Sequence, residues 1–161
     1  MKQGLIEPLG HLAAEELLHD LRAMDELRRF VLPDVWLEDK QLSAIDALSH
    51  SEGICVAVGL AEDRLPHGGD EKQGGMIHLG LAVYVFQAVD GVPVFSTREV
   101  ERVWLTVLHY AMRWSWQPPR EARSIKAVLR DISTVDLRQD VEDFAGQLVA
   151  NVLRMEVPAR V

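Results

Sequence analysis

The sequence lacks the features that mark disulfide-stapled, metal-binding and membrane proteins. Its single cysteine, Cys55, cannot form an internal disulfide or build a thiolate metal site alone. No apolar stretch approaches the roughly 20 residues that a membrane-spanning helix needs. The N-terminal region meets acidic side chains at Glu7, Glu15 and Glu16 before a signal-peptide core can form. These absences predict a cytoplasmic protein without a membrane partner.

Positive charge is also scarce. The chain has 17 Lys and Arg against 25 Asp and Glu, which gives a formal net charge of -8. An acidic chain repels a phosphate backbone, and no Lys/Arg cluster offers the local positive stripe of a nucleic-acid interface. We therefore expect no nucleic-acid partner. The later arginines are scattered among acidic residues and are predicted to lie on the solvated surface: Arg102, Arg113, Arg120, Arg123 and Arg130.

Signatures of catalysis are missing as well. The sequence has no phosphate-binding glycine motif, no nucleophile elbow and no His-Glu-x-x-His zinc motif. Cys55 lies in the apolar run Ile54–Leu60, where desolvation disfavours a thiolate, so a packed thiol is expected. His67 and Asp70 have the spacing of two metal ligands, but two ligands on a glycine-rich loop rarely define a site. We predict no catalytic residue, no metal site and no cofactor.

What the sequence does have is the composition of an ordinary globular domain. It has 161 residues, of which 48% are hydrophobic and 26% charged. A chain of this size buries roughly 70% of its unfolded surface, which is enough for a core without staples. No internal repeat or linker interrupts the sequence, so residues 1–161 are predicted to form a single domain.

In the first half of the chain, apolar spacing predicts a helix and a buried strand. Apolar residues three and four apart predict an amphipathic helix from about Leu12 to Phe30, and Pro33 prevents its continuation. Val35–Leu37 is interpreted as a short edge strand. Ile54–Leu60 is apolar at nearly every position, which is typical of a strand covered on both faces. Ala61–Gly75 then has the composition of a long, mobile polar loop.

The second half predicts one long strand, a helix and two more strands. Met76–Val89 alternates with period two, and a capping box at Ser96 and Glu99 predicts a helix that extends to Arg113. Ser124–Val135 has the pattern of a half-exposed strand. Gly146–Val157 fits either a helix or a strand, and its β-branched residues favour a strand antiparallel to the preceding one. The predicted fold class is α+β, with a mainly antiparallel sheet flanked by two principal helices.

Two segments carry candidate residues for contact with a partner. Trp114 and Trp116 beside a double proline fit either a capped core or an anchor for a partner, and we favour the core. His78 and Tyr84 share one face of the long strand and could line a pocket, although a sheet-surface role for His78 is the commoner one. The other candidate contact segment is the polar loop, with Arg64, His67, Asp70 and Lys72.

The order of elements resembles that of small phage tail proteins of the tail-terminator family. The matching features cover most of the chain: the N-terminal helix, the strand Ile54–Leu60, the acidic loop, the strand Met76–Val89, the capped helix Ser96–Arg113 and the terminal strands through Val157. Members of that family are α+β proteins that form a ring at the head-proximal end of a tail tube and stop its growth. The resemblance implies a homo-oligomeric ring that contacts tail-tube or neck proteins.

Three functional hypotheses follow from the sequence. The first is a structural assembly protein of a phage tail or related contractile particle, assembled into the virion from the cytoplasm. The second is a small cytoplasmic α+β enzyme or ligand-binding domain with a pocket near His78 and Tyr84. The third is an adaptor or an assembly chaperone. The missing catalytic motifs favour the first, because ring assembly needs edges and surfaces only.

Overall fold

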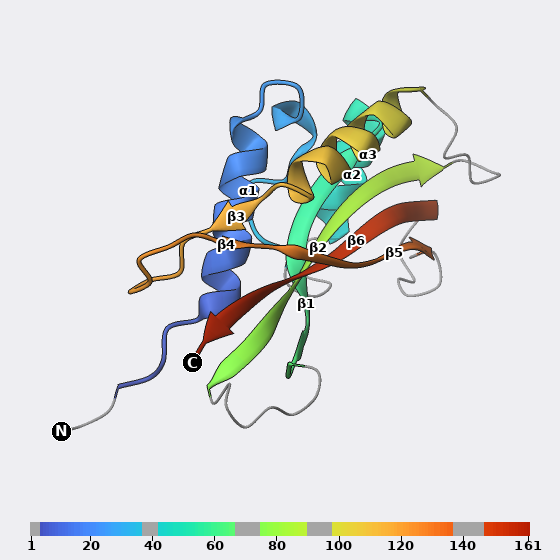
Figure 1. The fold of residues 1–161 in the computed structure, drawn as a ribbon. Helices are drawn as coiled ribbons and strands as arrows, with labels where there is room; N and C mark the ends of the chain where they lie inside the picture. The colour runs from blue at the N-terminus through green and yellow to red at the C-terminus, as the bar shows by residue number, and fades with distance from the viewer. Residues whose placement is uncertain (1–3, 37–41, 67–74, 90–97, 137–146) are drawn as a thin grey trace.

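Four long strands form one antiparallel sheet in a computed structural model that describes residues 4–36, 42–66, 75–89, 98–136 and 147–161 (Figure 1). The strand order is β1-β2-β6-β5. The strands are β1 (Cys55–Arg64), β2 (Met76–Val89), β6 (Gln147–Arg160) and β5 (Val128–Asp136). The predicted α+β class with a mainly antiparallel sheet is confirmed. The helical alternative for the C-terminal segment is wrong, because β6 pairs along its whole length with β2.

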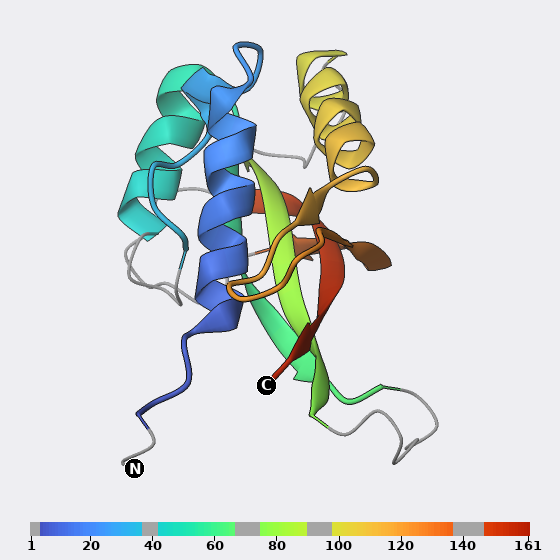
Figure 2. The ribbon, with the colours of Figure 1, turned by 60° about the vertical axis from the view of Figure 1, so that its left-hand side comes forward.

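Side chains that alternate along β2 divide the core in two. Leu81, Val83 and Val85 face a core that they share with the helices α1 (Leu9–Ala23) and α3 (Arg98–Ala111), and we call this side of the sheet the first face. Ala82 and Phe86 face the other way, toward the helix α2 (Leu42–Glu52), on the second face. The sheet is therefore covered on both sides, with α1 and α3 on the first face (Figure 2).

The first helix is shorter than predicted. α1 begins at Leu9 and ends at Ala23, and Met24 is already extended. The chain then turns into a single 3-10 turn, η1 (Arg28–Phe30). The apolar spacing continued past Ala23 because Leu27, Phe30 and Val31 are buried in the same core as α1, although they reach it from a turn.

Helix α2 was not predicted. Its signal is short: Ile45 and Ser49 are four residues apart and both are buried, with the half-buried Leu48 between them. Gly53, with a φ of 83°, follows the last helical residue, which is the usual conformation of a glycine at a helix end. α2 is the element that covers the second face at Phe86.

Two predicted boundaries around β1 are wrong. The strand continues to Arg64, which pairs with His78, so the polar loop begins later than Ala61. Residues 67–74, with His67, Asp70 and Lys72, lie outside the described part of the chain. Instead of a strand at Val35–Leu37, the chain makes isolated parallel bridges to β1 at Val31 and Trp36, and Leu37 is not described.

Helix α3 and the segment after it largely follow the predicted pattern. Val100, Val103 and Val107 are buried, whereas Met112, expected in the same stripe, is half exposed just beyond the helix end. The strand predicted over Ser124–Val135 is divided at Ala127 into β4 (Ile125–Lys126), which pairs with β3 (Ser115–Trp116), and β5. Ser96 lies outside the described residues. None of the described helices is long and apolar enough to cross a membrane.

Candidate functional site

The two outer strands of the sheet differ in how their free edges are treated. On β1, the preceding chain covers part of the edge: the Leu32 N–H donates to the Val56 carbonyl at 2.9 Å, and the Trp36 N–H donates to the Val58 carbonyl at 2.7 Å. Among the described residues, β5 pairs only with β6, and no backbone group pairs with the other side of β5. β5 is therefore the open edge of this sheet (Figure 1).

The open edge carries exposed apolar side chains. Ile132 is 56% exposed and Val128 is 53% exposed. Val128 pairs with Glu156 and Ile132 pairs with Leu153 across the strand, so the two apolar residues lie on opposite faces of the sheet. β5 contains no proline and no lysine, the residues that most often protect an edge strand from pairing with another chain.

The first charged residue of β5, Arg130, is turned inward, and its prediction as a solvated surface residue is wrong. Its side chain is only 6% exposed. The guanidinium donates to Glu156 Oε2 through Nη2 at 2.7 Å and through Nε at 3.0 Å, and Nη1 donates to the Glu62 carbonyl at 2.8 Å. Arg130 can reach these partners because the pairing of β5 with β6 is irregular between Leu129 and Asp131.

Arg130, Glu156, His78 and the Glu62 carbonyl form one polar cluster on the second face. His78 Nδ1 lies 3.0 Å from Glu156 Oε1. Beside it, the Gly80 N–H donates to Asp63 Oδ1 at 2.8 Å. The cluster thus connects all four strands, because its members come from β1, β2, β5 and β6.

The electrostatics of Glu156 follow from its neighbours. Partial burial raises the pKa of this carboxyl, but the hydrogen bonds and charge of Arg130, with a smaller contribution from His78, outweigh burial and hold the pKa below its usual 4.5. Both carboxylate oxygens are occupied by protein groups. An ionised carboxylate with engaged oxygens is suited to fixing strands and poorly suited to proton transfer.

The second charged residue of β5 is also paired within the sheet. Asp131 Oδ1 accepts from Arg154 Nη1 at 3.0 Å, and the same nitrogen lies 2.7 Å from Ser133 Oγ. Both side chains are partly exposed, so this pair contributes little stability by itself. Its effect is to keep the charge of Asp131 directed along the sheet.

Helix α3 presents a second exposed apolar surface on the first face. One flank faces α1 and the turn after it: Glu99 pairs with Arg29 at 2.8 Å, and burial and the nearby Asp20 carboxylate raise the pKa of Tyr110. The opposite flank carries Leu105 and Met112, each about half exposed. We call Leu105, Leu108 and Met112 the far flank of α3.

The two tryptophans proposed as contact residues belong to the core of the single chain. Trp114 and Trp116 are buried, as the favoured interpretation had it. Trp114 Nε1 donates to Asp20 Oδ2 at 2.9 Å, and this hydrogen bond joins the residue before β3 to α1. Arg64, the other described candidate, is exposed at the end of β1.

His78 and Tyr84, proposed as pocket residues, are both engaged with other side chains. His78 contacts Glu156, as described above. Tyr84 stacks on Phe86 with ring centroids 5.6 Å apart and meets the edge of Trp36 at 4.6 Å. Burial raises the pKa of Tyr84, and the nearby charge of Arg154 lowers it by less. These three aromatic rings pack on the second face, where the segment Val31–Trp36, which bridges to β1 and is called the bridging segment below, runs parallel to that strand.

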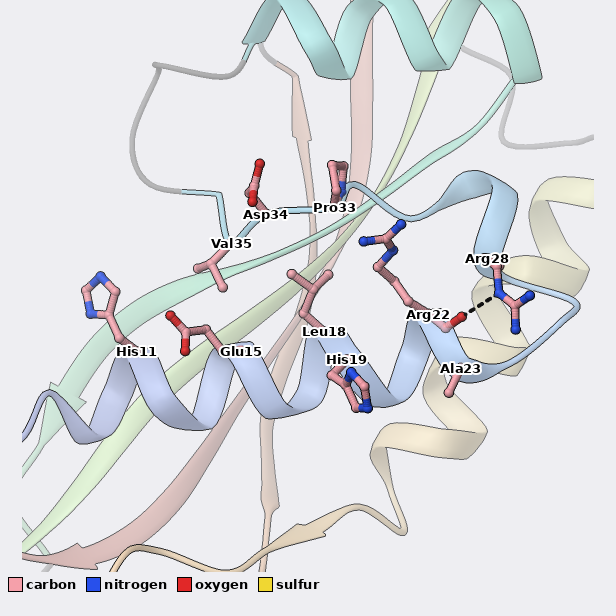
Figure 3. A pocket seen from close by; sticks show the side chains of 10 residues that line it. All are labelled: His11, Glu15, Leu18, His19, Arg22, Ala23, Arg28, Pro33, Asp34 and Val35. Carbon is pink, nitrogen blue, oxygen red and sulfur yellow. Dashed lines mark hydrogen bonds between the residues drawn. The ribbon is translucent and has the colours of Figure 1, made fainter.

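An open groove that the sequence did not predict lies along the outer side of α1. Figure 3 shows His11, Glu15 and His19 at four-residue intervals on the helix, opposite Asp34 and Val35. The groove has a volume of about 670 Å³. Among the described residues, no three His, Cys, Asp or Glu side chains are grouped to hold a metal ion.

Cys55 is fully buried in β1, and desolvation raises the pKa of its thiol to about 12. The expected packed thiol is confirmed.

Comparisons with known proteins identify no relative: no family model matches the sequence, and no curated protein matches it significantly. The residues and their geometry therefore carry the functional argument.

Proposed function

We propose that this protein is a structural assembly protein of a phage tail or a related contractile particle, and that it forms a homo-oligomeric ring that terminates or caps the tail tube. The observation that carries the proposal is the open β5 edge with its exposed Val128 and Ile132. An unpaired edge strand is a template on which another chain adds backbone hydrogen bonds. The resemblance in element order supplies the biological setting.

The protection of the remaining edge supports this reading. A protein that stays monomeric commonly guards both outer strands with charges, proline, bulges or a covering segment. Here the chain covers β1 through Trp36, whereas the described protection of β5 is limited to the irregularity at Arg130 and the pairing of Arg130 and Asp131 with β6. Beyond that irregularity, Asp131–Asp136 pairs regularly with β6 and offers a regular edge for another chain.

The polar cluster fits a scaffold role. Arg130 and Glu156 satisfy each other, and His78 is held on the same carboxylate, so these groups fix strand geometry. Assembly needs such a stable frame and no chemistry. The expected partners are further copies of this chain and the tail-tube or neck proteins.

The proposal is tested by measuring the mass of the purified protein by light scattering, alone and with the tail-tube protein of the same phage genome. We expect a discrete oligomer, or rings at the tube ends in electron micrographs. Ile132→Lys places a charge on the open edge and should abolish assembly without unfolding the chain, because the side chain is more than half exposed. Leu65→Lys, at an exposed position away from β5, is the matched control.

A protein that stays monomeric at high micromolar concentration and ignores the tube would overturn the proposal. The enzyme or ligand-binding hypothesis would then gain weight. A described hollow that could hold a ligand is the groove along α1 in Figure 3. Saturable binding of a small molecule, lost in His19→Ala and kept in Ile132→Lys, would favour that alternative.

A further inference from the structure

A short N-terminal arm, residues 4–8, precedes α1 and leads away from the sheet (Figures 1 and 2). Leu5 is fully exposed and Ile6 is 67% exposed. The arm has no regular secondary structure, and the first local backbone hydrogen bonds begin at Leu9. Two large apolar residues on an extended segment are costly to leave in water, so this arm has the character of a segment that is covered in an assembly.

Resting on the proposed self-assembly, we propose that the arm of one copy pairs as an added strand with the β5 edge of the next copy. The arm forms the added strand, and the outer side of β5 supplies the backbone groups to which it hydrogen-bonds. In a strand, successive side chains point to opposite faces, so Leu5 and Ile6 fall on opposite faces of the extended sheet. Ile132 is the exposed apolar side chain of the regular stretch Asp131–Asp136 and lies on the first face, so the arm residue that falls on that face can pack beside it.

The occupant is a second copy because the described part of the chain leaves Leu5, Ile6 and the outer side of β5 largely uncovered. The arm lies beside Pro119, Arg120 and Val161, which border a shallow hollow with it, and Leu5 remains fully exposed there. β5 has no backbone partner on its outer side among the described residues.

This contact is head to tail, because the donor and the acceptor are different surfaces of the same chain. Each copy that uses its arm on one neighbour keeps its own edge free for another. Such heterologous contacts generate rings when the rotation closes, whereas pairing of two β5 edges would stop at a dimer. Arm-to-edge pairing therefore explains how one sheet edge supports a ring.

The test uses one donor-defective and one acceptor-defective chain. Leu5→Lys combined with Ile6→Lys disables the arm, and Ile132→Lys disables the edge; all three positions are exposed, and circular dichroism verifies folding. Each variant alone should lose the wild-type oligomer and run as a monomer by light scattering. Mixed in equal amounts, they should form a heterodimer of twice the monomer mass and nothing larger, because one intact arm and one intact edge remain.

Leu5→Pro and Ile6→Pro, made separately, distinguish strand addition from simple apolar contact. Proline keeps an apolar side chain but removes a backbone donor, and the N–H groups of neighbouring strand residues point to opposite sides, so the one of the two variants whose N–H faces β5 should abolish assembly. Leu65→Lys should assemble like the wild type. Assembly by both proline variants would overturn strand addition.

The remaining outcomes distinguish this inference from the proposed function. If the arm-defective chain still forms the wild-type oligomer while Ile132→Lys does not, the arm inference is overturned and assembly through β5 stands. If the mixture of the two variants stays monomeric, the head-to-tail contact is overturned. If the wild type is itself monomeric with and without the tube protein, both proposals fall.

Discussion

The two edges of the sheet solve the same problem in opposite ways. β1 is covered by its own preceding chain, whose Trp36 bridges to Gly59 and packs its ring against Tyr84 and Phe86. β5 has no cover among the described residues, and two of its charged residues, Arg130 and Asp131, are paired with β6. The difference teaches that a sheet can be protected selectively. Under the proposed function, the edge that the chain leaves open is the one that assembly uses.

We expect the polar cluster to stabilise the open edge, so a variant that breaks the cluster should lower the free energy of unfolding more than the other variants below. Glu156→Gln removes the negative charge that faces the Arg130 guanidinium, and the Arg130 side chain is only 6% exposed. Because breaking a buried pair leaves an uncompensated charge, we expect the free energy of unfolding to fall by about 3 kcal/mol. Denaturant titration measures this loss. Glu26→Gln, at an exposed position in the turn after α1, is the control and should change little.

Hydrogen exchange locates the damage of Glu156→Gln. Backbone amides of β5 should lose protection, while the Leu32 and Trp36 amides bonded to β1 should keep theirs. Equal loss at both edges would contradict the idea that the cluster serves the open edge.

The closed edge can be opened at Gly59. A Cβ at this position would come 2.9 Å from the Trp36 carbonyl oxygen, which is closer than real Cβ contacts, so Gly59→Ala must displace the bridging segment. We expect a loss of about 2 kcal/mol, within the range for overpacking, and faster exchange of the Trp36 amide. Gly10→Ala in α1 is the control, because its Cβ would make only an ordinary contact with Leu60 at 3.7 Å. If Gly59→Ala leaves the Trp36 amide protected, the bridge is not what closes β1.

Acid should loosen the open edge before the closed one. The folded pKa of Glu156 lies below its usual 4.5, so its stabilising contribution is complete above that pH and is lost as the pH falls through the folded value. Protonation of Glu156 removes the negative partner of Arg130, which keeps its hydrogen bond to the Glu62 carbonyl oxygen. Protection factors of β5 amides should fall below pH 4.5, and Glu156→Gln should remove most of this dependence. An unchanged acid response in that variant would assign the effect to other carboxylates.

Period-two alternation was enough to predict the long strands, and apolar spacing of three and four residues was enough to predict α1 and α3. β2 has the bounds that its alternation predicted, and β6 is a strand because its β-branched residues outweigh the helical spacing. Boundaries failed where tertiary contacts replace local structure: Leu27 and Phe30 continue the spacing of α1 from a turn. Helix α2 was missed because its large apolar residues, Leu42, Ile45 and Leu48, recur at three-residue spacing over only two turns.

The candidate site was less predictable than the fold. The sequence shows Arg130 as one arginine among several, because its partners Glu156 and Glu62 are distant in the chain and only sheet pairing brings them together. The open edge follows from strand order, which no local pattern encodes. Trp114 was placed in the core by its size, but its bond to Asp20 required the structure.

Alkylation of Cys55 is the smallest effect that we expect, and its rate reports most directly on the opening of the closed edge. Its thiol is fully buried, and with a pKa of about 12 it holds almost no thiolate near neutral pH, so alkylation of the native protein must wait for an opening of β1. We expect slow modification in the wild type, faster modification in Gly59→Ala, and an unchanged slow rate in Ile132→Lys, which alters only the open edge. Thiol modification followed by mass spectrometry near pH 7 measures these rates, with the denatured chain as the fast reference. Rapid alkylation of the native wild type, with loss of function, would instead mark an activated thiolate and favour the enzyme hypothesis.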